Sequence, residues 1–168
     1  MTRTENNFGG WQHRQKVFPT FVRAALAGES LPVYGDGGHV RCWLHVEQHC
    51  AAIWHLIQYS IASGHTSQPH PSYSSEPGYW PTLGEVFHIA GEQEMTNLEL
   101  AETILKALDL PPHRIRFVPD HNIRPGHDRR YALNCDKLRA TGFEIKQDLP
   151  KLIKETVRWY ADNPEWCR

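Results

Sequence analysis

An aromatic ring, a carboxylate and a guanidinium lie close together in the sequence, at Tyr34, Asp36 and Arg41. They belong to residues 31–46, where two apolar runs flank an Asp-Gly-Gly turn, a pattern typical of a β-hairpin. The guanidinium carries a fixed fork of donors that matches phosphate oxygens two at a time. We therefore predict a seat for a planar base at Tyr34 and for a phosphate at Arg41. The alternative is an ordinary hairpin whose Arg41 faces solvent.

A second candidate lies at Asn97, between Thr96 and Glu99. Thr followed three residues later by Glu forms a capping box, which predicts a helix start. Asn97 then occupies the first turn, beside unpaired amides at the positive end of the helix dipole, where a phosphate or ribose hydroxyl fits. The alternative is a solvent-facing Asn97 that only helps to begin the helix.

A third candidate is the polar run over residues 124–131, which begins at Arg124, contains a Pro-Gly turn and ends at Tyr131. Its charged side chains and terminal aromatic ring can converge on a polar ligand. A solvated charged face is the alternative.

The histidines and cysteines suggest little metal or redox chemistry. His45 and His49 have the i, i+4 spacing of zinc ligands on a helix, but we expect His45 to end a strand, and the zinc-protease order of residues is missing. We predict no metal site. The four cysteines, Cys42, Cys50, Cys135 and Cys167, form no CxxC pair, which favours free thiols in a reducing compartment.

The elements that must position these candidates follow from periodicity. We predict helices over residues 16–28, 47–61, 97–110, 135–140 and 148–161, and strands over residues 86–91 and 114–118. In the second helix we expect one buried apolar face, formed by Cys50, Ile53, Trp54, Ile57 and Ile61. Residues 63–82 are rich in Gly, Ser, Pro and His, which predicts a mobile loop, and we favour a mobile insertion over a working lid.

Length and charge limit the class of protein. The chain has 168 residues, enough for one domain, with 18 basic and 19 acidic side chains. The basic excess typical of nucleic-acid binders is missing, as is an apolar run long enough to cross a bilayer. We expect a cytoplasmic protein that binds neither nucleic acid nor membranes.

Several motifs together resemble the carboxy-terminal half of dTDP-glucose 4,6-dehydratases, which are extended short-chain dehydrogenase/reductases. These are Asn-Asn-Phe-Gly at 6–9, Lys-Val-Phe-Pro at 16–19, Leu-Pro-Val-Tyr-Gly-Asp-Gly at 31–37, Val-Arg-Cys-Trp-Leu-His-Val-Glu at 40–47, Thr-Asn at 96–97 and Arg-Pro-Gly-His-Asp-Arg-Arg-Tyr at 124–131. The last motif is the most specific. Four positions depart from the family pattern, namely Gly10, Cys42, His45 and His88.

The resemblance implies a set of binding residues. Asn6 and Arg41 resemble the ligands of the phosphates, Pro32 and Tyr34 the wall against the base, and Lys16 and Val17 a substrate-contacting pair. The remaining substrate contacts implied are Asn97, Arg124, Asp128 and Tyr131, and Asn7 resembles a residue that borders the nicotinamide cofactor.

The family's cofactor-binding and catalytic motifs are missing from these 168 residues: neither the glycine-rich turn nor the Tyr-x-x-x-Lys pair occurs. We therefore expect an α/β fold, the carboxy-terminal substrate-binding portion of an extended short-chain dehydrogenase/reductase without the complete Rossmann domain. Residues 1–168 are expected to form a single sugar-nucleotide-binding domain. NAD is expected to serve the intact enzyme, a lyase, and this chain alone is expected to be inactive, with no catalytic residue.

Other functions stay open. The chain can be a stand-alone sugar-nucleotide-binding module, or one half of a split enzyme that pairs with a separate Rossmann-domain chain. It can also be the equivalent half of a UDP- or GDP-sugar epimerase, dehydratase or decarboxylase. Because a face that packs on the Rossmann half is exposed in this chain, self-association is a further expectation.

Overall fold

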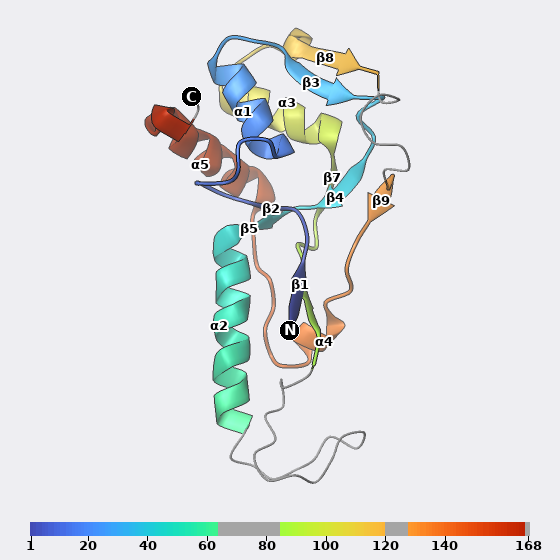
Figure 1. The fold of residues 1–168 in the computed structure, drawn as a ribbon, viewed down its shortest axis with the longest axis vertical. Coiled ribbons are helices and arrows are strands. Elements are labelled where there is room, and N and C mark those ends of the chain that lie inside the picture. The colour runs from blue at the N-terminus through green and yellow to red at the C-terminus, as the bar shows by residue number, and fades with distance from the viewer. Residues whose placement is uncertain (64–84, 120–127, 167–168) are drawn as a thin grey trace.

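Strands and helices alternate along the chain in the computed structural model, which describes residues 1–63, 85–119 and 128–166 (Figure 1). The strands are β1 (Thr2–Thr4), β2 (Asn7–Phe8), β3 (Leu31–Tyr34), β4 (Val40–Cys42), β5 (Leu44–His45), β6 (Phe87–Ile89), β7 (Glu94–Thr96), β8 (Ile115–Val118) and β9 (Arg130–Tyr131). The α-helices are α1 (Val17–Leu26), α2 (Val46–Ser63), α3 (Asn97–Ala107), α4 (Asp136–Arg139) and α5 (Leu149–Asp162), and Pro112–Arg114 and Pro164–Trp166 form short 3-10 helices.

Two hydrophobic cores divide the elongated molecule. The first lies among α1, α3 and α5 and includes Phe18, Ile104 and Tyr160. The second lies between α2, β6 and α4, at the opposite end in Figure 1. The segment that contains β4 and β5 connects the two cores. Trp43 packs in the first core, and the next residue, Leu44, packs in the second. The segment β4–β5 is therefore clamped between the two cores.

In the part of the chain that the structure describes, the strands form four small sheets. Parallel pairs join β1 to β6, β2 to β5 and β3 to β8. The fourth sheet has the order β7-β4-β9, with β4 antiparallel to β7 and parallel to β9. The mixed α/β character that we predicted from the sequence is confirmed.

The predicted hairpin at residues 31–46 is wrong. The tight turn exists, with the Gly37 amide donating to the Tyr34 carbonyl at 3.0 Å, but β3 and β4 then separate. Leu31 of β3 pairs with Ile115 of β8, and Val40 of β4 pairs with strands on both of its edges. Strands from distant parts of the chain outcompete the neighbouring strand because their pairing also completes the buried cores.

The predicted helices are confirmed, and their ends follow local chemistry. Gly28, at φ +77°, follows Ala27, the C-cap residue of α1, at a position where a left-handed residue is typical. The capping box of α3 is complete: Thr96 accepts from the Glu99 amide at 3.1 Å, and the Glu99 carboxylate accepts from the Thr96 amide at 2.7 Å. Asp148 caps α5 by accepting from the Lys151 amide. These signals are local, so the sequence alone reveals them.

The buried face predicted for α2 is wrong. Ala52 and Leu56 are buried, whereas Trp54, Ile57 and Ile61 are 62%, 45% and 47% exposed. Both sides of this helix carry apolar residues, so periodicity cannot tell which side meets the protein. The position of β5 and β6 decides it.

The structure bears on the cysteines, on the apolar helices and on the possible metal ligands. Cys42, Cys50 and Cys135 are free thiols, as predicted, and Cys167 lies outside the described residues. Within the described ranges, no helix is long and apolar enough to span a membrane, and no group of three or more His, Cys, Asp or Glu side chains could hold a metal ion. The loop predicted at 63–82 falls almost entirely outside the described residues, and the single-domain assignment stays a prediction.

Candidate functional site

Arg41 lies in the middle of β4 and is 4% exposed, so the alternative of a solvent-facing Arg41 is wrong. Its guanidinium donates to the Val40 carbonyl at 2.6 Å and to the Asp128 carbonyl at 2.9 Å. A weaker contact of 3.4 Å reaches the Arg129 carbonyl. Because backbone oxygens of β4 and of the segment just before β9 hold it, the guanidinium has a fixed orientation.

Tyr131 and Asn6 complete the surroundings of this cation. The Arg41 guanidinium lies 4.2 Å from the centre of the Tyr131 ring, a cation–π contact. The Tyr131 hydroxyl donates to Asn6 Oδ1 at 3.1 Å, while Asn6 Nδ2 is buried and has no hydrogen-bond partner. We call Asn6, Arg41, Asp128 and Tyr131 the Arg41 group. Asp128 belongs to it through its carbonyl.

A buried carboxyl adjoins the Arg41 group. Glu5 Oε1 accepts from the Leu133 amide at 3.0 Å, and Glu5 Oε2 is buried without a partner. Burial raises the pKa of Glu5, and the charge of Arg41 opposes that rise.

The charged run beyond Asp128 is partly a solvated face, which was the alternative. Arg129 makes a two-pronged ion pair with Asp36 at 2.7 and 2.8 Å, and Arg130 pairs with Glu94. The Arg129 guanidinium holds the pKa of Asp36 well below its usual range. Both arginine side chains are more than half exposed, at 61% and 59%. These pairs fasten β9 to its neighbours, so they shape the site and leave Arg41 as its buried cation.

Asn97 begins α3 next to the same sheet, since Thr96 pairs with Val40. The predicted anion seat on free amides is wrong. The amides of Asn97 and Leu98 donate to the carbonyls of His39 and Gly37, and the Glu99 amide is used by the capping box. Asn97 Oδ1, however, is buried without a hydrogen-bond partner. The Asn97 side chain, and not the backbone amides at the start of α3, is therefore the polar group available to a ligand.

The other predicted binding residues lie on neighbouring elements. Pro32 is half-buried on β3, and Tyr34 is 40% exposed at the end of that strand. Lys16 is the exposed residue that precedes α1, and Val17 is its half-buried first residue. The Arg41 group is formed by Asn6, by Arg41 of β4, by Asp128 just before β9 and by Tyr131 of β9. Pro32, Tyr34, Lys16 and Val17 are not part of it. Arg124 lies outside the described residues.

A polar cluster around Asn7 was only partly foreseen. The Asn7 side chain accepts from the Thr4 hydroxyl at 3.2 Å and lies 3.4 Å from His49 Nδ1. Since the amide nitrogen can only donate, His49 Nδ1 accepts, and the proton of the neutral ring belongs on Nε2. His49 Nε2 and His45 Nδ1 are both buried without a hydrogen-bond partner, and burial lowers the pKa of both rings. The i, i+4 spacing of His45 and His49, which is also that of zinc ligands on a helix, was visible in the sequence.

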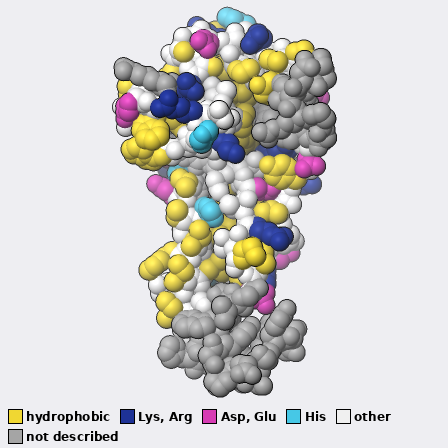
Figure 2. Space-filling model, in the orientation of Figure 1, with side chains coloured by type: hydrophobic (Ala, Val, Ile, Leu, Met, Phe, Trp, Pro, Cys, Tyr) yellow, Lys and Arg dark blue, Asp and Glu magenta, His cyan; other side chains and the backbone are white. Residues whose placement is uncertain are grey.

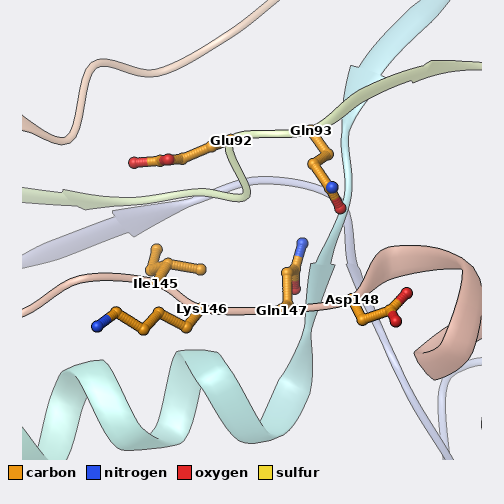
Figure 3. Close-up of a pocket in the computed structure, with 6 residues that line it drawn as sticks. All are labelled: Glu92, Gln93, Ile145, Lys146, Gln147 and Asp148. Atoms are coloured by element: carbon orange, nitrogen blue, oxygen red, sulfur yellow. The ribbon is translucent and has the colours of Figure 1, made fainter.

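Two open depressions elsewhere hold no predicted residue. One, of about 510 Å³, lies between the segment before β7 and the segment before α5 (Figure 3). Its lining residue Gln147 links the His45 amide to the Trp43 carbonyl, and Gln93 accepts from the Leu149 amide. These side chains have structural partners, so we assign no ligand to them.

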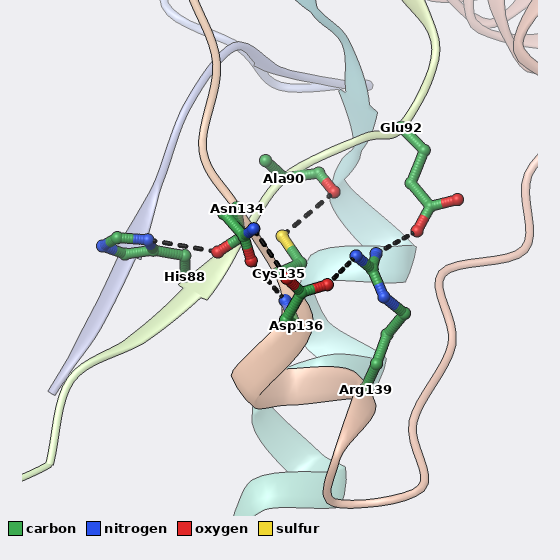
Figure 4. Close-up of polar contacts among 7 residues, drawn as sticks. All are labelled: His88, Ala90, Glu92, Asn134, Cys135, Asp136 and Arg139. Carbon is green, nitrogen blue, oxygen red and sulfur yellow. Dashed lines mark hydrogen bonds and ion pairs between the residues drawn. The ribbon is translucent and has the colours of Figure 1, made fainter.

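The second depression, also of about 510 Å³, borders the start of α4. Figure 4 shows how its side chains hold one another: Arg139 pairs with Glu92 and Asp136, and the Cys135 thiol contacts the Ala90 carbonyl at 3.8 Å. The His88 ring lies 3.2 Å from the Asn134 carbonyl. These contacts hold the segment after Tyr131 against β6 and the residues that follow it. They therefore help to fix the position of Tyr131 in the Arg41 group.

Comparison with known proteins gives a consistent picture. Residues 1–67 match the model of the NAD dependent epimerase/dehydratase family. The chain is 40% identical to a dTDP-glucose 4,6-dehydratase from Streptomyces niveus over 99% of its own length and 43% of that protein. A Streptomyces venezuelae dTDP-glucose 4,6-dehydratase, solved with NAD and TYD bound, matches 98% of the chain and 44% of the solved chain, with 35% identity and a TM-score of 0.77.

A more distant match shows the fold alone. The UDP-glucuronic acid 4-epimerase of Bacillus cereus has a TM-score of 0.75 at 13% identity. The chain therefore spans less than half the length of these relatives. Over nearly its whole length it is similar to part of the dTDP-glucose 4,6-dehydratases, and it has a partial extended short-chain dehydrogenase/reductase fold.

Proposed function

We propose that this chain is the substrate-binding half of an NAD-dependent dTDP-glucose 4,6-dehydratase and holds the nucleotide diphosphate of a dTDP-sugar. The observation that carries the proposal is Arg41, a buried guanidinium oriented by backbone carbonyls and stacked on Tyr131. A cation fixed in place before the ligand arrives loses little side-chain entropy on binding a diphosphate. Similarity to dTDP-glucose 4,6-dehydratases over nearly the whole chain supports it.

Each member of the Arg41 group has a role in this proposal. Arg41 donates to the diphosphate, and the buried amide of Asn6 supplies a further donor at Nδ2. Tyr131 holds Asn6 through its hydroxyl and Arg41 through its ring. Asp128 orients Arg41 through its carbonyl.

The remaining predicted residues surround the nucleoside and sugar in this proposal. Pro32 and Tyr34 form the wall against the base, and Asn97 presents Oδ1 as an acceptor for a ribose hydroxyl. Lys16 and Val17 contact the substrate from the start of α1, and Arg124 is retained as a predicted contact. A stacking wall accepts any planar base, so the choice among thymine, uracil and guanine needs a direct test.

The polar cluster at Asn7 fits an uncharged polar group such as the carboxamide of NAD. Asn7 carries no charge, burial favours the neutral form of the His45 and His49 rings by lowering their pKa, and one buried nitrogen of each ring has no hydrogen-bond partner. When bound, NAD would supply a hydride acceptor and donor for converting the hexose to a 4-keto-6-deoxy sugar with loss of water. In this proposal the residues of this chain bind and orient, and no proton transfer is assigned to them. We accordingly propose that the chain alone is inactive.

Titration of dTDP by calorimetry tests the proposal. We expect saturable binding that Arg41→Ala weakens by about 1.5–3 kcal/mol, or roughly 10–150-fold, because a hydrogen-bonded charge is lost. Arg41→Lys keeps the charge without the fork, so we expect an intermediate loss. Competition by UDP and GDP then ranks the bases.

Arg158→Ala is the matched control, since Arg158 is an exposed arginine on α5 whose side chain is 83% exposed. We expect it to bind dTDP like the unaltered chain. Thermal melting checks that each variant folds. A flat titration with the folded, unaltered chain, or equal affinity in the Arg41→Ala and Arg158→Ala variants, would refute the proposal.

A further inference from the structure

Glu5 is a buried acid that the proposed function leaves without a role. It directly precedes Asn6 and is 8% exposed. Oε1 of its carboxyl accepts from the Leu133 amide at 3.0 Å, but Oε2 is buried and has no hydrogen-bond partner. An ionised carboxylate out of water is stable only when hydrogen bonds or opposite charge replace its lost hydration. Oε2 gains no such bond, so opposite charge has to stabilise the ionised form of Glu5.

The groups that face Glu5 come from three strands and from the start of a helix. They are Arg41 and Cys42 of β4, Glu94 of β7, Arg130 of β9 and Cys135, which precedes α4. Burial raises the pKa of both thiols, that of Cys42 to about 11, so both are uncharged near neutral pH. Arg130 donates to Glu94 at 2.9 Å, and the charges of this ion pair largely cancel. Arg41 is left as the cation that stabilises an ionised Glu5.

Arg41 acts on Glu5 strongly because both side chains are buried. Figure 2 shows Lys and Arg side chains interspersed with Asp and Glu side chains over the face in view, where water and salt screen them. Arg41 is 4% exposed, so its charge is screened much less. The diphosphate assigned to Arg41 brings negative charge to the same cation. Glu5 and the diphosphate therefore compete for one positive charge.

We infer that Glu5 selects the ligand by charge: as a carboxylate it opposes a diphosphate, and binding of a dTDP-sugar is accompanied by the uptake of one proton at Glu5. The proton comes from the solvent and bonds to Oε2, the oxygen without a partner, and no other bond forms or breaks. This inference rests on the proposed function, which supplies the ligand and its place at Arg41.

The direction of the pH dependence follows from linkage. Burial already raises the pKa of Glu5, and a bound anion beside Arg41 raises it further, because like charge disfavours the carboxylate. The complex therefore holds the proton more tightly than the free chain does, and by reciprocity the protonated chain holds the ligand more tightly. The affinity should fall as the pH rises from the pKa of Glu5 in the free chain to its pKa in the complex. Each unit between these two pKa values corresponds to about tenfold in affinity.

Calorimetry with dTDP-glucose between pH 5 and pH 8 tests the inference. This titrant is chosen because its diphosphate carries the sugar and lacks the free terminal phosphate of dTDP, which itself gains a proton at about pH 6. We expect the affinity to fall roughly tenfold across this range. Titrations in buffers of different ionisation enthalpy should show net proton uptake on binding.

Glu5→Gln keeps an acceptor for the Leu133 amide and removes the carboxylate. We expect a nearly flat pH profile and, at pH 8, roughly tenfold tighter binding than that of the unaltered chain. Glu102→Gln is the matched control, because Glu102 is an exposed glutamate on α3, and it should keep the profile of the unaltered chain. Both variants retain every histidine, so the difference between their profiles reports on Glu5.

A second readout uses the unaltered chain alone. ¹³C NMR of its glutamate carboxyls should show one that titrates above the ordinary pKa of 4.5 and titrates at still higher pH when dTDP-glucose is bound. The inference is overturned by equal pH profiles in the two glutamine variants, by weaker binding of Glu5→Gln at pH 8, or by the absence of such a carboxyl. Saturable binding that depends on Arg41 but takes up no proton would overturn it and leave the proposed function intact, whereas a flat titration at every pH would overturn both.

Discussion

The hydrogen bond between Tyr131 and Asn6 joins residues 125 positions apart and closes the Arg41 group. Asn6 adopts φ +44°, in the left-handed region, and only a few residue types tolerate that conformation. Asn6 therefore has two separable functions, one in its backbone and one in its side chain. Three substitutions, Tyr131→Phe, Asn6→Gly and Asn6→Ala, distinguish them.

The magnitudes follow from the lost contacts. Tyr131→Phe removes one neutral hydrogen bond of 3.1 Å and should lower the free energy of unfolding by about 0.5–1.5 kcal/mol. Asn6→Ala loses the same bond and adds about 1–2 kcal/mol for a left-handed alanine. Asn6→Gly loses the bond without that strain but adds about 0.4–1 kcal/mol of unfolded-state entropy. We expect alanine to cost roughly 1 kcal/mol more than glycine at this position.

Urea unfolding of the single variants and of the Asn6→Gly, Tyr131→Phe double variant measures these terms. We expect a coupling energy of about 0.5–1.5 kcal/mol between the two positions, since both single variants remove the same bond. At this chain length each kcal/mol shifts the melting temperature by about 2–4 °C, which gives a second readout. Additive effects in the double variant would refute the hydrogen bond. Equal stabilities of the glycine and alanine variants would refute the left-handed backbone.

Three further predictions concern charge, thiols and activity. Burial lowers the pKa of His45 and His49, so the unfolded chain binds more protons than the folded chain below the ordinary histidine pKa. The free energy of unfolding, measured with urea, should therefore fall as the pH drops from 7 to 5. The fall should be smaller in the double variant His45→Gln, His49→Gln. In a Cys167→Ser background, exposed Cys50 should react first with a disulfide reagent and Cys50→Ser should remove that fast phase, because burial raises the pKa of the Cys42 thiol to about 11. The pure chain with NAD and dTDP-glucose should form no 4-keto-6-deoxy sugar by chromatography, and measurable product would contradict the assignment as a binding half.

The helix ends were predictable because their signals are local. Thr96 and Glu99 are three residues apart, and the capping box they form needs no other part of the chain. The same holds for Asp148 at the start of α5. The apolar residues of that helix follow helical spacing on one side only, and Ile153, Val157 and Tyr160 on that side are buried. Local hydrogen bonds and one-sided periodicity carry this information.

The strand pairing was not predictable in the same way. Val33 pairs with Phe117, more than 80 residues away in sequence, and this distant pairing replaced the expected hairpin. A turn signal specifies a reversal of the chain but not the strand that pairs after it. The exposure of Trp54, Ile57 and Ile61 on α2 was equally unpredictable, because a helix with apolar residues on two sides is oriented by its neighbours.

Chemistry alone pointed to Arg41 as an anion ligand, and its type and its place in a strand were visible in the sequence. Only the tertiary structure decided that the guanidinium is buried, that the Asp128 carbonyl holds it, and that the amides of Asn97, Leu98 and Glu99 are already used. Residue types and local hydrogen bonds are properties of short segments, so the sequence determines them. Burial and partners depend on which distant segments meet, and folding alone decides that.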